Sequence, residues 1–161
     1  MTVSVLFQQH FQVAYVVRDI KAATQRFARE FGIARWDVMD MAALLGPGHG
    51  TRFIGNAYAG EVMIELIEPD PTGESLYRDW IPDAADGVRL HHLGFLVRSD
   101  ADFRAAVAQL EAAGYPTAHS GSFGDNLDYH YADTTALLGH YYELIHLKPA
   151  GEQFFARIPR N

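Results

Sequence analysis

Hydrophobic and polar residues follow two different periods along this 161-residue chain. Apolar residues at steps of three and four predict a helix that begins after Asp19 and stops at Gly32, and a second that begins after Ser99 or Asp100 and stops at Gly114. Short apolar and alternating runs predict strands at 12–18, 35–41, 51–58 and 61–67, and again at 92–98, 117–122, 127–133 and 140–147. Each half of the chain is therefore predicted to fold as β-α-β-β-β.

An internal repeat links the two halves. The segment QVAYVVR at 12–18 is similar to HLGFLVR at 92–98, 80 residues later, and the tripeptide ELI at 65–67 recurs at 143–145, 78 residues later. Such self-similarity indicates two copies of one structural unit. We therefore expect an α+β fold in which two βαβββ modules form curved mixed sheets around a shared cavity.

The same pattern places the module boundaries. The first module is expected at 1–70, a proline-containing linker with a short helix near 75–81 at 71–87, the second module at 88–149, and a C-terminal tail at 150–161. Phe154, Phe155 and Ile158 in the tail are costly to leave in water, so the tail is expected to pack on the body of the chain or on a second subunit. We expect a homodimer.

Composition narrows the classes of function. Hydrophobic residues make up 48% and charged residues 20%, which is typical of globular proteins, and the absence of cysteine excludes disulfides, thiolate metal sites and cysteine nucleophiles. The formal net charge of −7 disfavours nucleic acid or an anionic membrane as the main partner. No apolar run approaches the ~20 residues of a membrane span, and the N-terminal stretch lacks the basic residues of a secretory signal. We therefore expect a cytoplasmic protein.

Four polar residues stand at repeat-equivalent positions in otherwise apolar strands: Gln12, Glu65, His92 and Glu143. Taken singly, each is a surface residue or a hydrogen-bonded structural residue. Taken together they favour a metal site, because two buried carboxylates repel each other and a divalent cation balances them. The repeat register selects His92 over the neighbouring His91. An amide, an imidazole and two carboxylates predict one divalent metal per subunit, with Zn²⁺ the first choice and Ni²⁺, Co²⁺ and Mn²⁺ compatible.

The motifs FQVAYVVRDIKAA, LHHLGFLV and GHYYELI, with the paired modules, resemble the vicinal oxygen chelate superfamily, also called the glyoxalase/bleomycin-resistance/dioxygenase family. The linker LIEPDPTGESLYRDW is similar to that of methylmalonyl-CoA epimerases, whereas the set Gln, Glu, His, Glu resembles the ligands of glyoxalase I. The resemblance implies a small carbonyl substrate whose α-proton is removed through a metal-stabilised enediolate. Gln12 replaces one histidine of the ring-cleaving Fe(II) dioxygenases, so that chemistry is disfavoured.

The resemblance also implies roles for individual residues. Glu143 is the leading candidate for the base as well as a ligand, Glu65 is its rival, and His49 is the candidate for a second acid or base. Four further residues are candidates for the substrate pocket: Arg52, Tyr129, His130 and Tyr131. Two-residue alternation predicts that His130 faces the opposite side of its strand from both tyrosines. For each there is a structural alternative, namely a surface loop for His49, core packing for the strand residues, and an exposed position for Arg52.

The predicted function is that of a metal-dependent isomerase, epimerase or lyase of the glyoxalase type. Two alternatives come from other classes. One is a small-molecule-binding protein like the bleomycin-resistance proteins, which catalyses nothing, and the other is a structural or regulatory domain that keeps only the fold. An Fe(II) ring-cleaving dioxygenase is a further, less favoured alternative.

Overall fold

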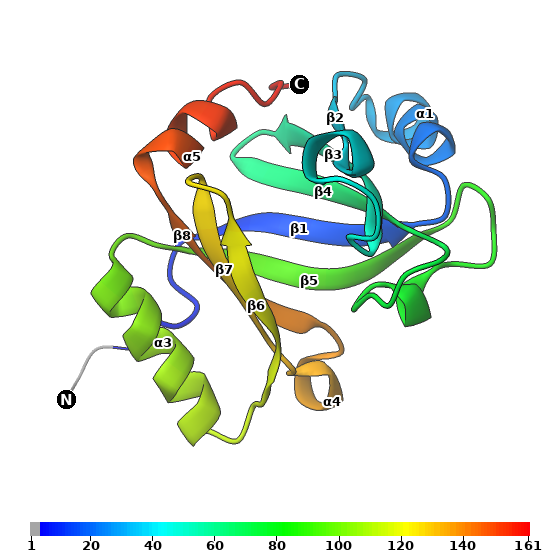
Figure 1. The fold of residues 1–161 in the computed structure, drawn as a ribbon. Helices are drawn as coiled ribbons and strands as arrows, with labels where there is room; N and C mark the ends of the chain where they lie inside the picture. Colours follow the sequence, from blue (N-terminus) through cyan, green and yellow to red (C-terminus); the bar gives the residue numbers. More distant parts are fainter. Residues whose placement is uncertain (1–3) are drawn as a thin grey trace. The chain divides into compact units, whose positions relative to one another are not determined.

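The computed structural model describes residues 4–161, so the first three residues of the predicted first module and of the N-terminal stretch lie outside the described part. Its strands and helices are shown in Figure 1. In chain order they are β1 (His10–Val17), α1 (Ile20–Phe31), β2 (Asp37–Asp40), α2 (Met41–Leu45), β3 (Thr51–Ala59), β4 (Val62–Pro69), the 3-10 turn η1 (Arg78–Trp80), β5 (Val88–Val97), α3 (Asp100–Ala112), β6 (Thr117–Phe123), β7 (Leu127–Ala132), α4 (Thr135–Leu138), β8 (Tyr141–Leu147) and α5 (Pro149–Phe155).

The strands have the hydrogen-bonded order β2-β3-β4-β1-β5-β8-β7-β6. Strands β5 and β8 are parallel, whereas β2-β3-β4 and β6-β7-β8 are antiparallel, so the sheet is mixed. Outward from its first strand, each module has the same order, β1-β4-β3-β2 in one and β5-β8-β7-β6 in the other. The predicted α+β class with paired βαβββ modules is confirmed, although the strands form one hydrogen-bonded series where two sheets were expected.

The chain divides into two compact units. The first compact unit contains the described residues up to Gln12 together with His92–Arg157, and the second contains Val13–His91 with Ile158–Asn161. Strands β1 and β5 therefore each contribute residues to both units.

The second compact unit is built around helix α1. Asp19 caps the helix by accepting a hydrogen bond from the Ala22 backbone N–H, and Gly32 ends it in a left-handed conformation. Buried Glu68 accepts a further hydrogen bond, 2.8 Å long, from the Ile20 N–H at the start of the helix. The apolar side of α1 packs on strands β1, β3 and β4 in a core of buried residues: Val17, Ile20, Ala23, Phe27, Ile33, Ala57 and Leu66.

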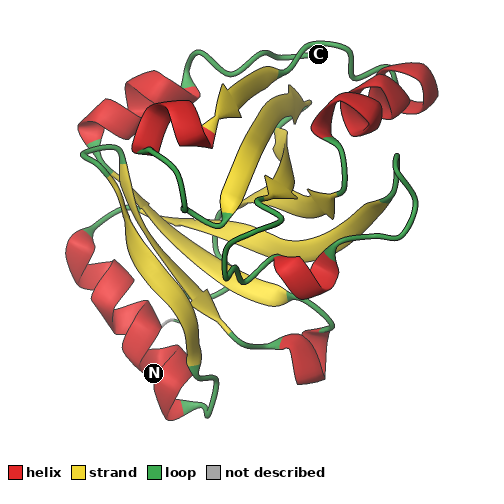
Figure 2. Ribbon diagram, turned by 45° about the vertical axis from the view of Figure 1, so that its right-hand side comes forward, coloured by secondary structure: helices red, strands yellow, loops and turns green. Residues whose placement is uncertain are grey.

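The first compact unit repeats this plan with helix α3, which lies along one face of its strands (Figure 2). Ser99 caps the helix by accepting from the Asp102 N–H. The core contains Phe95, Val97, Ala106, Leu110, Ala132, Tyr142 and Leu144. The rings of Phe95 and Tyr142 stack with centroids 4.3 Å apart, and burial raises the pKa of Tyr142 to about 12.

The C-terminal tail packs on its own chain. The ring of Phe155 on α5 contacts Phe11, with centroids 5.9 Å apart, and Phe154 contacts Phe123, all within the first compact unit. Ile158 is buried in the second. The homodimer and the exact module boundaries stay predictions. Among the described residues, no helix is long and apolar enough to cross a lipid bilayer.

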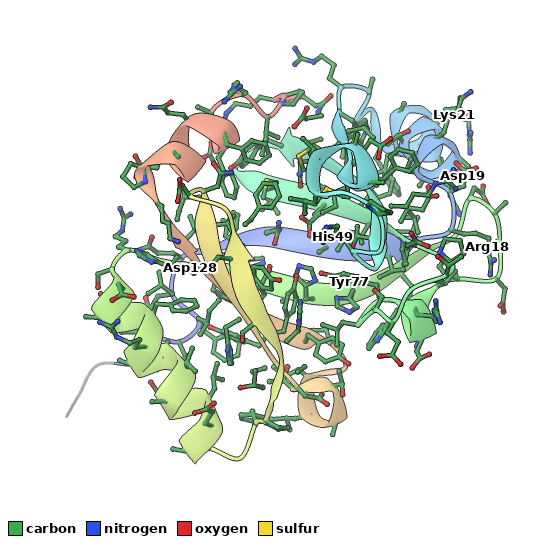
Figure 3. The ribbon with its side chains drawn as sticks, viewed as in Figure 1. Arg18, Asp19, Lys21, His49, Tyr77 and Asp128 are labelled. Atoms are coloured by element: carbon green, nitrogen blue, oxygen red, sulfur yellow. The ribbon has the colours of Figure 1, made fainter. Side chains whose placement is uncertain are left out.

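A polar cluster joins β6, β7 and β8 on the α3 side of the first compact unit. Asp128, which Figure 3 labels, accepts hydrogen bonds from Ser122 and from Lys148, whose Nζ lies 2.7 Å away. The Nδ1 of His146 lies 3.6 Å from the second carboxylate oxygen. The hydrogen bonds from Lys148 and Ser122 hold the pKa of the Asp128 carboxyl below its ordinary value.

This cluster predicts a pH-dependent contribution to stability. A depressed folded-state pKa stabilises the protein above the unfolded value of about 3.9, and the gain is lost as the pH falls through the folded value. Asp128→Asn should lower the free energy of unfolding by about 1 kcal/mol at pH 7, and the difference from the wild type should shrink below about pH 4. Urea unfolding from pH 7 to pH 3 measures both, with the exposed Asp125→Asn as control. An equal difference at all pH values would contradict the prediction.

Candidate functional site

Three of the four predicted ligands lie in the first compact unit: Gln12, His92 and Glu143. Glu143 on β8 is the register partner of Gly94 on β5, and His92 precedes Gly94 by two residues. Their neighbours Phe95 and Leu144 belong to the core against α3. Because side chains alternate along a strand, His92, Gly94 and Glu143 face away from α3.

Two side chains of this group are in contact, and the third lies against Gly94. His92 Nε2 lies 3.1 Å from Glu143 Oε2, and both residues are buried. Gln12 is only 2% exposed and covers Gly94, since a Cβ added to Gly94 would lie 2.6 Å from Gln12 Oε1 and 2.9 Å from its Cβ. The glycine is therefore required for the Gln12 side chain to reach this position.

The chemistry of these atoms fits a divalent cation. The Oε1 of Gln12 is buried and has no hydrogen-bond partner among the described residues, a state that costs about 1–3 kcal/mol. An amide oxygen, an imidazole nitrogen and a carboxylate are ligands that Zn²⁺ and related ions accept. The described residues contain no group of three or more His, Cys, Asp or Glu placed to hold a metal, so the group in this unit depends on the amide of Gln12.

Aromatic residues border the group on the same face. Tyr131 is the register partner of Glu143, and its ring meets His92 edge-on with centroids 4.9 Å apart. Tyr129 Oη lies 3.0 Å from Nε2 of the exposed His119. Burial raises the pKa of Tyr129, and the charge of Glu143 raises it further. Tyr131 thus borders Glu143, and the edge-strand residue His119 is in turn the register partner of Tyr131.

His130 lies on the other side of the strand. Its register partner is Leu144, which belongs to the core against α3, and burial lowers the pKa of the imidazole. The alternation between His130 and the two tyrosines is as the sequence predicts.

Glu65 lies in the second compact unit, on strand β4. Its register partner is Asn56 on β3. The neighbouring Leu66 and Ala57 belong to the core against α1, so Glu65 and Asn56 face away from that helix. Its assignment as a metal ligand stays a prediction.

The remaining candidates of the second unit are exposed. His49 lies in the loop between α2 and β3 (Figure 3), and its ring contacts the Leu45 carbonyl. The Arg52 guanidinium lies 3.3 Å from Glu68 Oε1 and 5.2 Å from the centroid of the Phe53 ring.

The sequence of residues 11–132 matches a family model described as Glyoxalase/Bleomycin resistance protein/Dioxygenase superfamily. The chain belongs to this superfamily. The fold agrees with the resemblance noted in the sequence. A comparison with curated proteins found no match.

Several solved structures share the fold at low identity. A variant of Streptomyces coelicolor methylmalonyl-CoA epimerase, in complex with 2-nitronate-propionyl-CoA, is 15% identical with a TM-score of 0.63 over 88% of this chain and 95% of that chain. Methylmalonyl-CoA epimerase from Mycobacterium tuberculosis is 16% identical with a TM-score of 0.61 over 95% and 97%. A hypothetical protein from Bacillus halodurans C-125 is 16% identical with a TM-score of 0.62 over 87% and 94%.

Three residues of this superfamily member were not singled out from the sequence: Asn56, Gly94 and His119. The repeat carries a signal for one of them. Gly94 stands 80 residues after Ala14 in the aligned strands, and small residues there allow close approach. Asn56 opposes Glu65 as Tyr131 opposes Glu143, but this equivalence is known only from the strand pairing. His119 carries no comparable signal, since it depends on the pairing of β6 with β7.

Gly94→Ala should disturb Gln12 directly. The added methyl group would overlap the Gln12 side chain, and overpacking of this kind lowers the free energy of unfolding by about 1–3 kcal/mol. Urea unfolding measures the change. Gly73→Ala is the control, because its added Cβ would meet Gly50 at an ordinary 3.5 Å. Equal stability of the two variants would contradict the placement of Gln12.

Proposed function

We propose that the protein is a metal-dependent isomerase, epimerase or lyase of the glyoxalase type, which removes an α-proton from a small carbonyl substrate. The observation that carries this proposal is the buried contact between His92 and Glu143, 3.1 Å long, together with the buried Oε1 of Gln12 that lies against Gly94, the register partner of Glu143. The superfamily often binds a divalent metal, and these atoms are suitable ligands for one.

Gln12, His92 and Glu143 would hold the cation from the first compact unit, and Glu65 is the fourth ligand proposed from the repeat. Zn²⁺ is the first choice for this set, with Ni²⁺, Co²⁺ and Mn²⁺ compatible. When bound, the cation would act as a Lewis acid on a substrate carbonyl and so acidify the neighbouring C–H. Because the Gln12 amide and the His92 imidazole are neutral, the carboxylates of Glu65 and Glu143 would balance the charge of the cation.

Glu143 is the proposed base. A carboxylate oxygen of Glu143 accepts the α-proton while the electron pair of the C–H bond stays on the substrate, and the same oxygen returns the proton at the end of the reaction. The neighbouring His92 orients the carboxylate, and buried Tyr131 limits the access of water from the β7 side. Glu65 is the rival base, and His49 remains the proposed second acid or base.

The structural neighbours favour enzymatic activity. The epimerases that share this fold include complexes with an acyl-CoA analogue, which supports an acyl-CoA thioester as one substrate class to test. A second candidate function is non-catalytic binding of a small molecule, and the aromatic rim of His119, Tyr129 and Tyr131 favours it. A small-molecule partner is common to both functions.

Exchange of the substrate α-proton in heavy water separates the two functions. The purified protein, loaded with Zn²⁺, Ni²⁺, Co²⁺ or Mn²⁺, is incubated with acyl-CoA thioesters, hemithioacetals and hydroxyketones, and exchange is followed by NMR. Metal-dependent exchange supports the enzyme. Tight binding of a compound with no exchange in any class would support the binding protein instead.

Metal content should depend on the proposed ligands. Glu65→Ala and His92→Ala should abolish tight binding, whereas Gln12→Ala removes only a neutral ligand and should weaken binding less. Elemental analysis after dialysis gives the metal per subunit, expected to be about one in the wild type. Glu61→Ala, on the exposed turn before β4, is the control. Full metal content in both Glu65→Ala and His92→Ala would exclude the proposed site.

Glu143→Gln tests the base separately from the ligand. The amide keeps an oxygen for the metal but loses basicity, so the variant should retain most of its metal and lose about 10²–10⁴-fold in exchange rate. Elemental analysis and the exchange assay measure both quantities on one sample. Wild-type exchange by a metal-loaded Glu143→Gln protein would leave Glu143 as a ligand only and move attention to Glu65 or His49.

A further inference from the structure

A row of polar side chains crosses three adjacent strands of the second compact unit. Asp37 on β2, Asn56 on β3 and Glu65 on β4 are successive register partners. The adjacent Gly55 points the other way, since a Cβ added there would lie 3.3 Å from Ile20 of α1 and 3.6 Å from Val38. The three polar side chains therefore share the face opposite α1.

Asn56, at the centre of the row, holds an unused acceptor. The residue is 3% exposed, and its Oδ1 has no hydrogen-bond partner among the described residues. Buried amide oxygens are nearly always paired in native proteins, and an unpaired one calls for an explanation. Directly opposed side chains on antiparallel strands have Cβ atoms about 4.5–5.5 Å apart, so Asp37 and Glu65 are the nearest neighbours of Asn56 on either side across the strands.

The composition of the row defines what it can bind. Two carboxylates and an amide provide five oxygen acceptors, whereas the amide nitrogen of Asn56 is their one donor group. The Oδ1 of Asn56 therefore needs a hydrogen-bond donor from a ligand. Asp37, whose charge is not used to balance the proposed metal, repels an anion placed beside Asn56.

We propose that Asp37, Asn56 and Glu65 form a specificity subsite for the hydroxyl groups of a neutral, polyhydroxylated ketone. Asn56 Oδ1 accepts a hydrogen bond from a substrate hydroxyl, and the charge of Asp37 excludes a carboxylate at the same position. The inference rests on the proposed function, in which Glu65 is a metal ligand, and it narrows the substrate classes considered there. Acyl-CoA thioesters that carry a free carboxylate near the reacting carbon are disfavoured.

Three symmetrical ketones test the subsite because they differ only in their end groups: dihydroxyacetone, 1,3-dimethoxyacetone and acetone-1,3-dicarboxylate. The wild type should exchange the α-protons of dihydroxyacetone at least about 100-fold faster than those of its dimethyl ether, relative to the uncatalysed rates, because a site built for a hydroxyl rejects analogues without it. Exchange of the dicarboxylate should be slower still.

Three variants test whether the row of Asp37, Asn56 and Glu65 causes the preference for hydroxyl groups. Asn56→Leu removes both polar atoms at similar volume and should reduce the hydroxyl preference to less than about 10-fold, with the metal content unchanged. Asp37→Asn removes one charge and should raise exchange of the dicarboxylate about 10-fold. Glu61→Gln removes a charge outside the row and should change neither ratio. Loss of metal in Asn56→Leu would make Asn56 a metal ligand and overturn the proposal.

NMR gives a readout independent of turnover. The Asn56 side-chain amide signal, identified by its absence in Asn56→Leu, should shift on titration with dihydroxyacetone and not with the dimethyl ether. A selective shift without exchange of any ketone, acyl-CoA thioester or hemithioacetal would support the subsite while excluding the proposed function. Exchange without a selective shift, with the preference intact in Asn56→Leu, would overturn the subsite and leave the proposed function standing. The absence of both a selective shift and exchange of any of these compounds would overturn both.

Discussion

Each strand of this sheet has to serve two different environments, because successive side chains point to opposite faces. In the first compact unit, Phe95 and Leu144 pack on α3, so Gly94 and Glu143 must face the other way. In the second, Leu66 packs on α1 and Glu65 must face away from it. A slip of one residue would bring the carboxylates into the helix cores, so apolar packing on one face fixes the register of the polar face.

The polar face of the first unit is costly by itself. Glu143, His92 and Gln12 are all buried, and the first two are in contact at 3.1 Å. The contact between the Glu143 carboxylate and the His92 imidazole partly offsets the cost of burying both groups. The amide oxygen of Gln12, however, has no hydrogen-bond partner among the described residues. The position of that amide depends in turn on Gly94, where any side chain would overlap it. Apolar side chains at these three positions would carry none of these costs. The presence of buried polar side chains therefore indicates that they bind a ligand.

Much of this arrangement could be predicted from the sequence because it is repeated. The two offsets near 80 residues aligned Gln12 with His92 and Glu65 with Glu143, and two-residue alternation separated His130 from its tyrosine neighbours. The caps Asp19 and Ser99 and the stop at Gly32 were also readable, since capping is a local property. Strand β2 ends at Asp40, before the end of its predicted range, because Asp40 caps α2 by accepting from the Ala43 N–H.

What could not be predicted depends on register between strands. Nothing local to Asp37 or Asn56 indicates that they oppose each other, and β2 has only four residues. The pairing of His119 with Tyr129 likewise needs the β6–β7 register, which contains an irregularity between Thr117 and His119. Hydrophobic pattern assigns a residue to a face, but the neighbours across the sheet follow only when the pairing is known.

The two modules have similar backbones but carry different side chains at equivalent positions. Opposite its glutamate, the first module places Asn56 and the second places Tyr131, and on the first strand of each module Gln12 corresponds to His92. The second module therefore combines an imidazole, aromatic rings and a carboxylate, which suit proton transfer, whereas the first combines amides and carboxylates, which suit recognition of hydroxyl groups. Duplication supplies two similar polar faces, and substitutions at equivalent positions allow the two faces to take different roles without a change in the fold.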